Sequence, residues 1–409
     1  MTSMSLFGAY EDQDEAFPQV KYGHPKDRRV DLKQVQAGLA VSGDGGIPLF
    51  HRVYDGGAGE VAQVVGAMNA LRKMADRRDF LLVADSKLVS HPNVTALLDA
   101  KVAFIAPAPA AKVPDEVYAG LDLEDARVVD YAPDRDKGKP ADRQEVYRVL
   151  EDVHTIAGRR KSDPVHTLRR ILVHSTGNAR GQQTARAKRL ARAAEDLDKL
   201  QRGAGGRFYG TAEKIAARIG VIARTHRVEN CLRTTITTDE AGRPGLEWHF
   251  DQEVLDAQEA VDGWYALLTS LTPDQATTEQ VLLRYKGQVV VERRYHDFKG
   301  PLAVAPVFLQ HNRRIAALIT VIYLALLVFC LIERQVRQAL GPELTMRGLY
   351  PDNRAVRPTG RMIFYHLASL MIRPGTATSP PVVLINRGVQ AHLLELLGID
   401  ETRPRWLET

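Results

Sequence analysis

The sequence predicts an α/β protein, and the pattern of its first hundred residues carries that prediction. Two short and almost continuously apolar runs, 79–85 and 101–108, are typical of buried strands. The segments 59–78 and 91–100 place apolar residues at helical spacing, one before the first run and one between the two. Strands that alternate with helices in this way indicate a layered α/β domain.

A hairpin is predicted ahead of these elements. Residues 32–42 alternate loosely between apolar and polar side chains, a Gly/Asp-rich turn follows, and 47–54 is a second apolar run. Two such runs around a turn favour paired antiparallel strands. The regular pattern stops at 109–160, which is rich in Pro, Asp, Lys and Arg.

The second half of the chain mixes both element types. Its length of 409 residues favours two domains, or one domain with a large insertion. Its tail contains Pro/Gly-rich turns and an amphipathic segment. Strands are predicted at 168–176, 245–255 and 263–270, and helices at 181–203, 210–224, 276–297 and 312–338.

The composition also bears on where in the cell the protein is located. Two cysteines far apart, Cys231 and Cys330, argue against a disulfide framework and favour a reducing cytoplasm. The run Ile315–Ile332 has 18 residues, of which only Thr320 and Tyr323 are polar, and it is just long enough to span a bilayer. Its charged flanks and the lack of a second apolar run favour a helix that is buried on all its sides in the core of a soluble protein. A single-span membrane protein is the alternative.

A basic helix is the first candidate site. The net charge of +5 permits polyanion binding without requiring it. Arg186, Arg189 and Arg192 recur every three residues, and Leu190, Leu197 and Leu200 form the opposite face. Such a face either contacts phosphates or is simply solvated. Sequence motifs for serine hydrolases, zinc peptidases, paired C-x-x-C sites and P-loops are absent from the chain.

Two carboxylates are the second candidate. Asp85 ends an apolar run, where the simplest role is a turn or cap. Glu292 lies among apolar residues, where the simplest role is an ion pair with Arg293, His296 or Lys299. Carboxylates at a strand end and on a flanking helix can instead meet at one sheet edge and hold divalent cations.

A stripe of polar residues decides between these roles. Tyr285, Gln288, Glu292 and Lys299 are spaced by three, four and seven residues, steps that return to one face of a helix. The pattern Y-x2-Q-x3-E-x6-K resembles the Y-x2-R-x3-E-x6-K signature of DDE transposases from bacterial insertion sequences, in the insertion-sequence-four group. The resemblance covers roughly residues 1–335 and includes the segments 21–60, 81–98, 262–270 and 292–329.

The resemblance implies an α/β fold with a ribonuclease-H-like catalytic core and a large mixed α+β insertion between the second aspartate, Asp85, and Glu292. The implied order is a first part of the core at 1–108, the insertion at 109–275, a second part with the glutamate helix at 276–340 and a helical tail at 341–409.

The resemblance also implies a function, which is metal-dependent cleavage and strand transfer at insertion-sequence ends. Asp85 and Glu292 would be catalytic and would bind two Mg²⁺ or Mn²⁺ ions. The implied partner is double-stranded DNA, both the transposon ends and the target. The protein would bind it as a homodimer assembled on that DNA. The implied location is the cytoplasm, at the nucleoid and not at a membrane. The DNA-binding residues would be Tyr285, Gln288, Lys299, Arg186, Arg189 and Arg192.

Two departures qualify the resemblance. Gln288 stands where the signature has Arg, so that contact would carry no charge. Met1, Thr2 and Ser3 match the residues that follow the first catalytic aspartate, so this aspartate is expected directly before Met1 in an N-terminally truncated chain that is inactive as it stands. Glu11, Asp12 and Asp14 lie past the strand and are poor substitutes. A non-catalytic DNA-binding remnant is therefore the alternative function.

Overall fold

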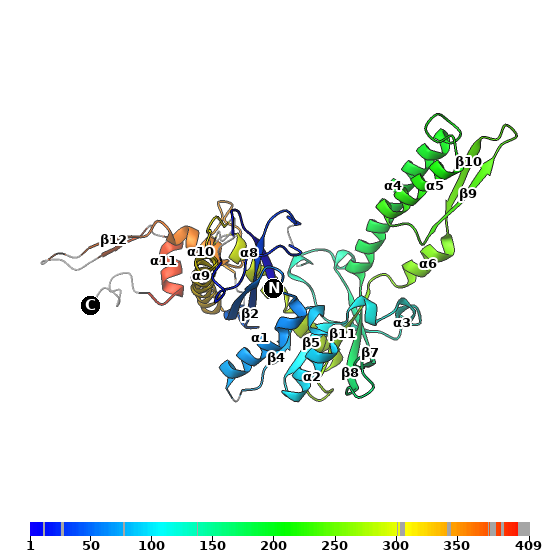
Figure 1. The fold of residues 1–409 in the computed structure, drawn as a ribbon. Coiled ribbons are helices and arrows are strands. Elements are labelled where there is room, and N and C mark those ends of the chain that lie inside the picture. The colour runs from blue at the N-terminus through cyan, green and yellow to red at the C-terminus, as the bar shows by residue number, and fades with distance from the viewer. Residues whose placement is uncertain are drawn as a thin grey trace. The chain divides into compact units, whose positions relative to one another are not determined.

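The chain divides into two compact units. The computed structural model describes residues 1–399 except 11–12, 26–27, 77, 137, 301, 303–306, 342–344, 375, 377–381 and 386–387. Within these residues it is a mixed α/β protein (Figure 1), as the sequence predicts. Unit 1 comprises Met1–Asp79 and Lys286–Thr409, and unit 2 comprises Phe80–Tyr285.

Unit 1 is built on a small antiparallel sheet in the order β1-β2-β3. The predicted hairpin is confirmed, and its turn closes through the Ser42 amide, which donates to the Ile47 carbonyl at 2.8 Å. Gly45 and Gly46 occupy this turn with φ of 72° and 63°, a region that favours glycine. The strands and the helix that follows are β1 (Thr2–Ser5), β2 (Gln34–Val41), β3 (Pro48–Asp55) and α1 (Glu60–Ala75).

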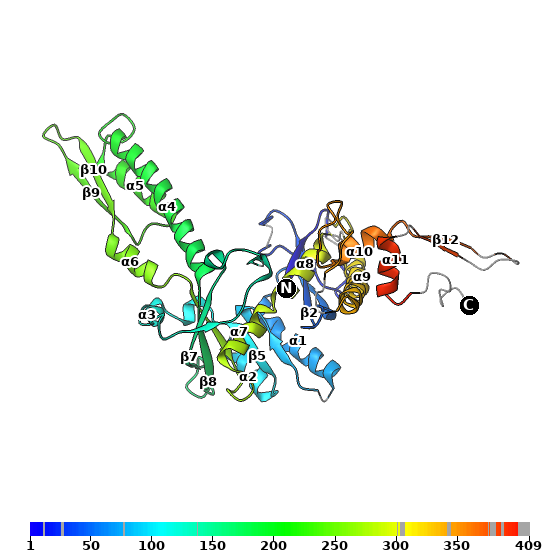
Figure 2. The same cartoon turned by 180° about the vertical axis from the view of Figure 1, so that it is seen from behind.

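Helices from the C-terminal half complete unit 1. The core joins β1 and β2 to α9, through contacts among Met4, Val35, Ile319 and Leu326. The helices α10 and α11 lie beside α9 in both views (Figures 1 and 2). These elements are α8 (Val289–Lys299), α9 (Asn312–Ala339), α10 (Gly360–Leu367), the paired β12 (Met371–Arg373) and β13 (Val382–Leu384), and α11 (Val389–Leu396).

The apolar helix α9 is buried on one face only. Ile315, Ile319 and Phe329 are buried in the core, whereas Val321 is 60% exposed and Leu324 is 52% exposed. The expectation of a helix buried on all sides is therefore wrong. Among the described residues α9 is the one helix long and apolar enough to cross a membrane, a test that core helices also pass.

Unit 2 contains a six-stranded sheet in the order β4-β5-β11-β8-β7-β6. The β4–β5 pair is parallel and is joined through α2, and the other neighbours are antiparallel. Ser90 caps α2 by accepting a hydrogen bond from the Asn93 amide at 3.4 Å. The elements are β4 (Leu81–Val83), α2 (His91–Asp99), β5 (Ala103–Pro107), α3 (Asp115–Ala119), β6 (Arg127–Val129), β7 (Tyr147–Ile156), β8 (His166–Ser175), β11 (Trp264–Thr269) and α7 (Thr278–Lys286).

An arm between β8 and β11 carries the basic helix. Two helices run side by side with a hairpin along them (Figures 1 and 2). Leu197 and Leu200 are buried against Ile215 and Leu246, which confirms the predicted apolar face. The predicted strand 245–255 is too long, because Asp251 caps a helix there. The arm consists of α4 (Thr176–Gly203), α5 (Ala212–His226), β9 (Leu232–Thr238), β10 (Pro244–Phe250) and α6 (Gln252–Ala260).

The unit boundaries differ from the domain boundaries that the resemblance implies. The chain passes between units at 79/80 and 285/286, whereas the implied boundaries were 108/109 and 275/276. The physical reason is strand pairing, because β4 and β5 share one sheet with β11 and β8. They therefore belong to the same compact unit as the predicted insertion.

The prediction of one helix over 276–297 is wrong, because two helices replace it. α7 ends at Lys286 and α8 begins at Val289. At the break the Val290 amide donates to the Gly287 carbonyl at 3.1 Å and the Val291 amide donates to the Gln288 carbonyl at 3.0 Å. These are tighter i→i+3 bonds, placed where a glycine and three β-branched residues lower helix propensity.

Candidate functional site

The polar stripe does not form one continuous helical face. Tyr285 lies in α7 of unit 2 and packs against a core cluster that includes Ile105 and Leu267. Gln288, Glu292 and Lys299 belong to unit 1. The Oε1 atom of Gln288 is buried and accepts no hydrogen bond from the residues that the structure describes. The structure thus places Glu292 and Lys299 on α8, and Gln288 at its N-cap.

Glu292 is an exposed carboxylate in the first turn of α8. Within the described part of the chain it forms no hydrogen bond or ion pair, and the expected pairing with Arg293, His296 or Lys299 is not seen. Lys299 instead donates from Nζ to the Ser3 carbonyl at 2.7 Å, which ties the end of α8 to β1.

Buried residues set the rotation of α8. Arg294 and Phe298 are 1% and 4% exposed. At about 100° per residue, Glu292 and Lys299 lie within about 20° of each other around the helix axis, and Arg294 lies about 160° from Glu292. The burial of Arg294 and Phe298 therefore turns the Glu292 side chain away from the core.

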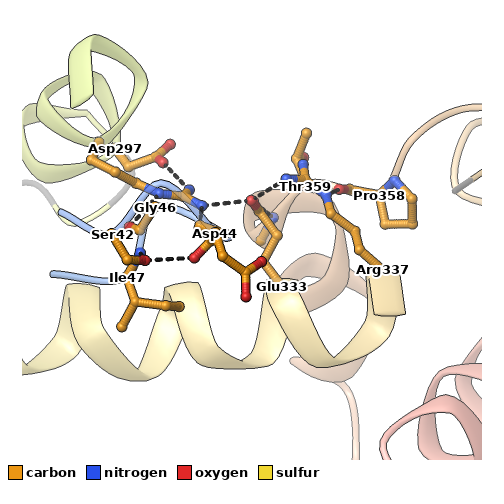
Figure 3. A network of polar contacts seen from close by, with 12 residues as sticks. Ser42, Asp44, Gly46, Ile47, Asp297, Glu333, Arg337, Pro358 and Thr359 are labelled. Carbon is orange, nitrogen blue, oxygen red and sulfur yellow. Dashed lines mark hydrogen bonds and ion pairs between the residues drawn. The ribbon is translucent and has the colours of Figure 1, made fainter. Parts of the chain in front are cut away.

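Arg294 holds α8 through contacts with Gly46, Asp297 and Glu333, three residues that are labelled in Figure 3. Its Nε donates to the Gly46 carbonyl at 3.1 Å and its Nη2 to the Gly45 carbonyl at 2.6 Å. Its Nη1 contacts Asp297 Oδ2 at 2.9 Å, and Nη2 also contacts Glu333 Oε1 at 2.7 Å. A Cβ at Gly46 would lie 2.3 Å from Val290 Cγ1, so the turn must have glycine there to approach α8.

Glu333 joins α8 to the rest of unit 1. Its Oε1 also pairs with Arg337 Nη1 at 2.6 Å, and its Oε2 accepts from the Gly360 amide at 2.7 Å (Figure 3). Arg337 in turn donates from Nε to the Pro358 carbonyl at 2.7 Å. Two strands of the sheet, α8, α9 and α10 are thereby held in one orientation.

The charges in this network shift its pKa values. Burial acts to raise the pKa of Glu333, but the Arg294 hydrogen bond and the charges of Arg337 and Arg294 outweigh it and lower the pKa. Burial raises the pKa of Asp297 despite Arg294. Burial lowers the pKa of Arg337 to about 10. Glu333 is thus the charged partner of two buried cations. The sequence gives no signal for the links from Arg294 to Gly46 and Glu333, because these residues lie 248 and 39 positions away along the chain.

Asp85 lies two residues after β4 and is exposed. It is the N-cap of the short 3₁₀ helix η1 (Ser86–Leu88), and its Oδ1 accepts from the Lys87 amide at 2.9 Å. The cap predicted for a strand-end aspartate is therefore confirmed. Asp85 and Glu292 both offer hard oxygen donors of the kind that Mg²⁺ prefers. Among the described residues no group of three or more His, Cys, Asp or Glu side chains is placed to hold a metal.

The three arginines of α4 do not share one role. Arg186 pairs with Asp262, with side chains only 11% and 6% exposed, and its Nη2 donates to the Gln258 carbonyl at 3.3 Å. It therefore fixes α4 to the segment before β11, and the expectation that it lies on an open phosphate-binding face is wrong. Arg189 and Arg192 are exposed and contact no acidic partner in the described ranges.

Comparison with known proteins gives no independent assignment. No protein-family model matches the chain, and no curated protein matches its sequence.

Proposed function

We propose that this protein is a DDE-type transposase that cleaves and rejoins DNA at the ends of an insertion sequence, using a ribonuclease-H-like core. The observation that supports this proposal best is Glu292. Its carboxylate is exposed and unpaired within the described residues, while the opposite face of α8 is held by Arg294. A glutamate with a purely structural role would be expected to use one of its neighbouring cations.

The proposed roles follow from donor chemistry. Asp85 and Glu292 would hold Mg²⁺ or Mn²⁺, because carboxylate oxygens suit hard cations. Two bound ions would supply activation of the attacking hydroxyl and stabilisation of the leaving oxygen in phosphoryl transfer. Arg294 is a positioning residue in this proposal, since it acts through the orientation of α8.

The DNA contacts are proposed on charge and exposure. Arg189 and Arg192 present guanidinium groups on α4 that can contact backbone phosphates. The resemblance, and not exposure, adds Tyr285, Gln288 and Lys299 to the proposed set, with Lys299 placed near β1 by its bond to Ser3. The partner is double-stranded DNA, bound by a homodimer at the nucleoid.

The test is strand cleavage of a supercoiled plasmid that carries the DNA flanking this gene. The protein is expressed from its whole reading frame, with any codons upstream of Met1. We expect Mg²⁺-dependent cleavage that Glu292→Gln and Asp85→Asn each reduce by at least about 100-fold, as the removal of residues that act in the transition state does.

The matched control is Glu253→Gln, which removes an exposed carboxylate from the first turn of another helix, α6. It should cleave at the parent rate and keep the same circular dichroism spectrum. DNA binding by the parent without metal-dependent cleavage would support the non-catalytic remnant instead. Unchanged cleavage by Glu292→Gln would refute the assigned role of this residue.

A further inference from the structure

An apolar stripe runs along the face of α9 that does not pack on the sheet. Its exposed side chains are Val321, Leu324, Val328 and Leu331, with exposed fractions of 60%, 52%, 52% and 47%. The outer face of a helix in a soluble domain is normally polar. Four large apolar side chains exposed along one helix face make this face a candidate interaction site.

The spacing of the stripe specifies another helix as its partner. The steps from Val321 to Leu331 are three, four and three residues, and exposed Ala317 and Gln335 extend the series by four at each end. Alternating steps of three and four form a heptad repeat, the spacing by which one helix packs along another. The stripe from Ala317 to Gln335 spans about 27 Å at 1.5 Å per residue.

A bilayer is a poorer partner for this helix. The opposite face of α9 is part of the core of unit 1, where Ile319 and Leu326 belong to the same buried cluster as Met4 of β1 and Phe329 stacks on Phe364 of α10. The same helix carries buried Glu333, which pairs with Arg294 and Arg337. Crossing a membrane would require all of these interactions to break.

We propose that this stripe is a self-association surface, on which α9 of a second copy packs in the antiparallel direction without DNA. The repeat is symmetric about position 326, so a two-fold axis at the level of Leu326 places the stripe of one copy against the stripe of the other. Val321 then faces Leu331 of the second copy, and Leu324 faces its Val328. Every apolar layer pairs one Val with one Leu.

Charge selects the antiparallel direction. The first turn of α9 carries exposed Arg313 and Arg314, and Arg314 lies on the stripe three residues before Ala317. In a parallel pair, Arg314 of one copy would face Arg314 of the other copy in the same layer. In the antiparallel pair it faces Gln338 of the second copy, next to the helix C-terminus, whose dipole is negative and attracts a cation.

The first test is sedimentation equilibrium of the full chain without DNA. The parent should be dimeric, and Leu324→Glu/Val328→Glu should be monomeric with an unchanged circular dichroism spectrum. Val221→Glu on α5, where the replaced side chain is 42% exposed, is the matched control and should remain dimeric. A parent that is monomeric throughout, or a double variant as dimeric as the parent, overturns the proposal.

Disulfide trapping tests the direction and does not depend on the folding of the glutamate variants. Val321→Cys and Leu331→Cys should crosslink when mixed and oxidised, and neither should crosslink alone. The parent is the background, because its own Cys231 and Cys330 are buried. Crosslinking of Val321→Cys with itself would indicate a parallel pair and overturn the proposal. The proposal is also overturned if the parent binds phosphatidylcholine vesicles and Leu324→Glu/Val328→Glu does not.

The inference goes beyond the proposed function, and the two fail separately. Self-association is measured without DNA or metal, whereas cleavage is measured by its dependence on Glu292. A chain that dimerises through α9 and cuts no DNA would keep this inference and reject the transposase.

Discussion

Arg294 and Glu333 show how a buried ion pair orients a residue that neither of them touches. Both side chains are only 2% exposed, and each has several hydrogen-bonding partners. Buried charges are tolerated when they are paired and fully hydrogen-bonded, and removing one partner leaves the other charge buried alone. The network therefore holds α8 by its buried face, which leaves Glu292 exposed.

We predict that Glu333→Gln lowers the free energy of unfolding by about 3–5 kcal/mol at pH 7, because it leaves Arg294 and Arg337 without their buried carboxylate. Denaturant unfolding measures this decrease. Asp44→Asn is the control, since Asp44 forms a neighbouring pair with Arg334 in which the two side chains are 67% and 33% exposed. Its decrease should be no more than about 1 kcal/mol. Equal decreases in the two variants would mean that the buried network contributes no special stability.

The stabilising effect of Glu333 should depend on pH. The pKa of Glu333 is lower in the folded protein than its ordinary value, so its contribution is present above the unfolded pKa, about 4.3. It disappears as the pH falls through the folded pKa. The stability difference between the parent and Glu333→Gln should thus shrink below about pH 4. Asp297, whose raised pKa acts in the opposite direction, is present in both chains. A difference that stays constant from pH 7 to pH 3 contradicts this assignment.

At the scale of elements, α4 shows that equal spacing does not give equal roles. Arg186 is nearly buried against Asp262, whereas Arg189 and Arg192 are exposed. A cation that is already paired inside the protein has little left to offer a phosphate. The sequence places the three arginines on one face, but only the fold shows which of them has an acidic partner 76 residues away.

We predict that Arg189→Ala/Arg192→Ala weakens DNA binding and flattens its salt dependence. For every phosphate that the protein no longer neutralises, the slope of log affinity against log salt should fall by about 0.9. Fluorescence anisotropy at several salt concentrations measures the slope. Lys199→Ala is the control, because this α4 cation is paired with Glu195 at 2.7 Å. A double variant with the parent's slope would show that the face is only solvated.

The elements that sequence patterns predicted well are those with a strong apolar signal. The runs that became β4 and β5, and the helices α1, α2 and α9, were predicted in type and position. β9 was missed because most of its side chains, including several threonines, are exposed. β7 was missed because its alternation lies within a highly charged segment. The break between α7 and α8 was missed because the polar stripe keeps helical spacing across Gly287.

The candidate site was predictable only in part. Asp85 and Glu292 were singled out from the sequence and their metal-binding role stays a prediction, whereas the residues that orient α8 were not predicted. The sequence alone does not distinguish Arg294 from a surface cation, because its acceptors at Gly45 and Gly46 lie almost 250 positions earlier in the chain. Local patterns identify donors and acceptors, and tertiary pairing decides which of them remain available.

At the scale of the whole molecule, the proposed function assigns one carboxylate to each unit. Asp85 belongs to unit 2 and Glu292 to unit 1, and each is exposed within its unit. The claim that both are metal ligands is therefore the central claim, and it can be tested without knowledge of the DNA sequence recognised.

The most direct measurement is binding of Mn²⁺ to the protein, followed by the decrease of the free-ion signal in electron paramagnetic resonance. We expect the parent to bind Mn²⁺ in competition with Mg²⁺. Glu292→Gln and Asp85→Asn should each weaken binding by at least about tenfold, which corresponds to about 1.4 kcal/mol. Glu253→Gln should bind as the parent does. Mn²⁺ affinity in Glu292→Gln and Asp85→Asn equal to that of the parent would contradict the account.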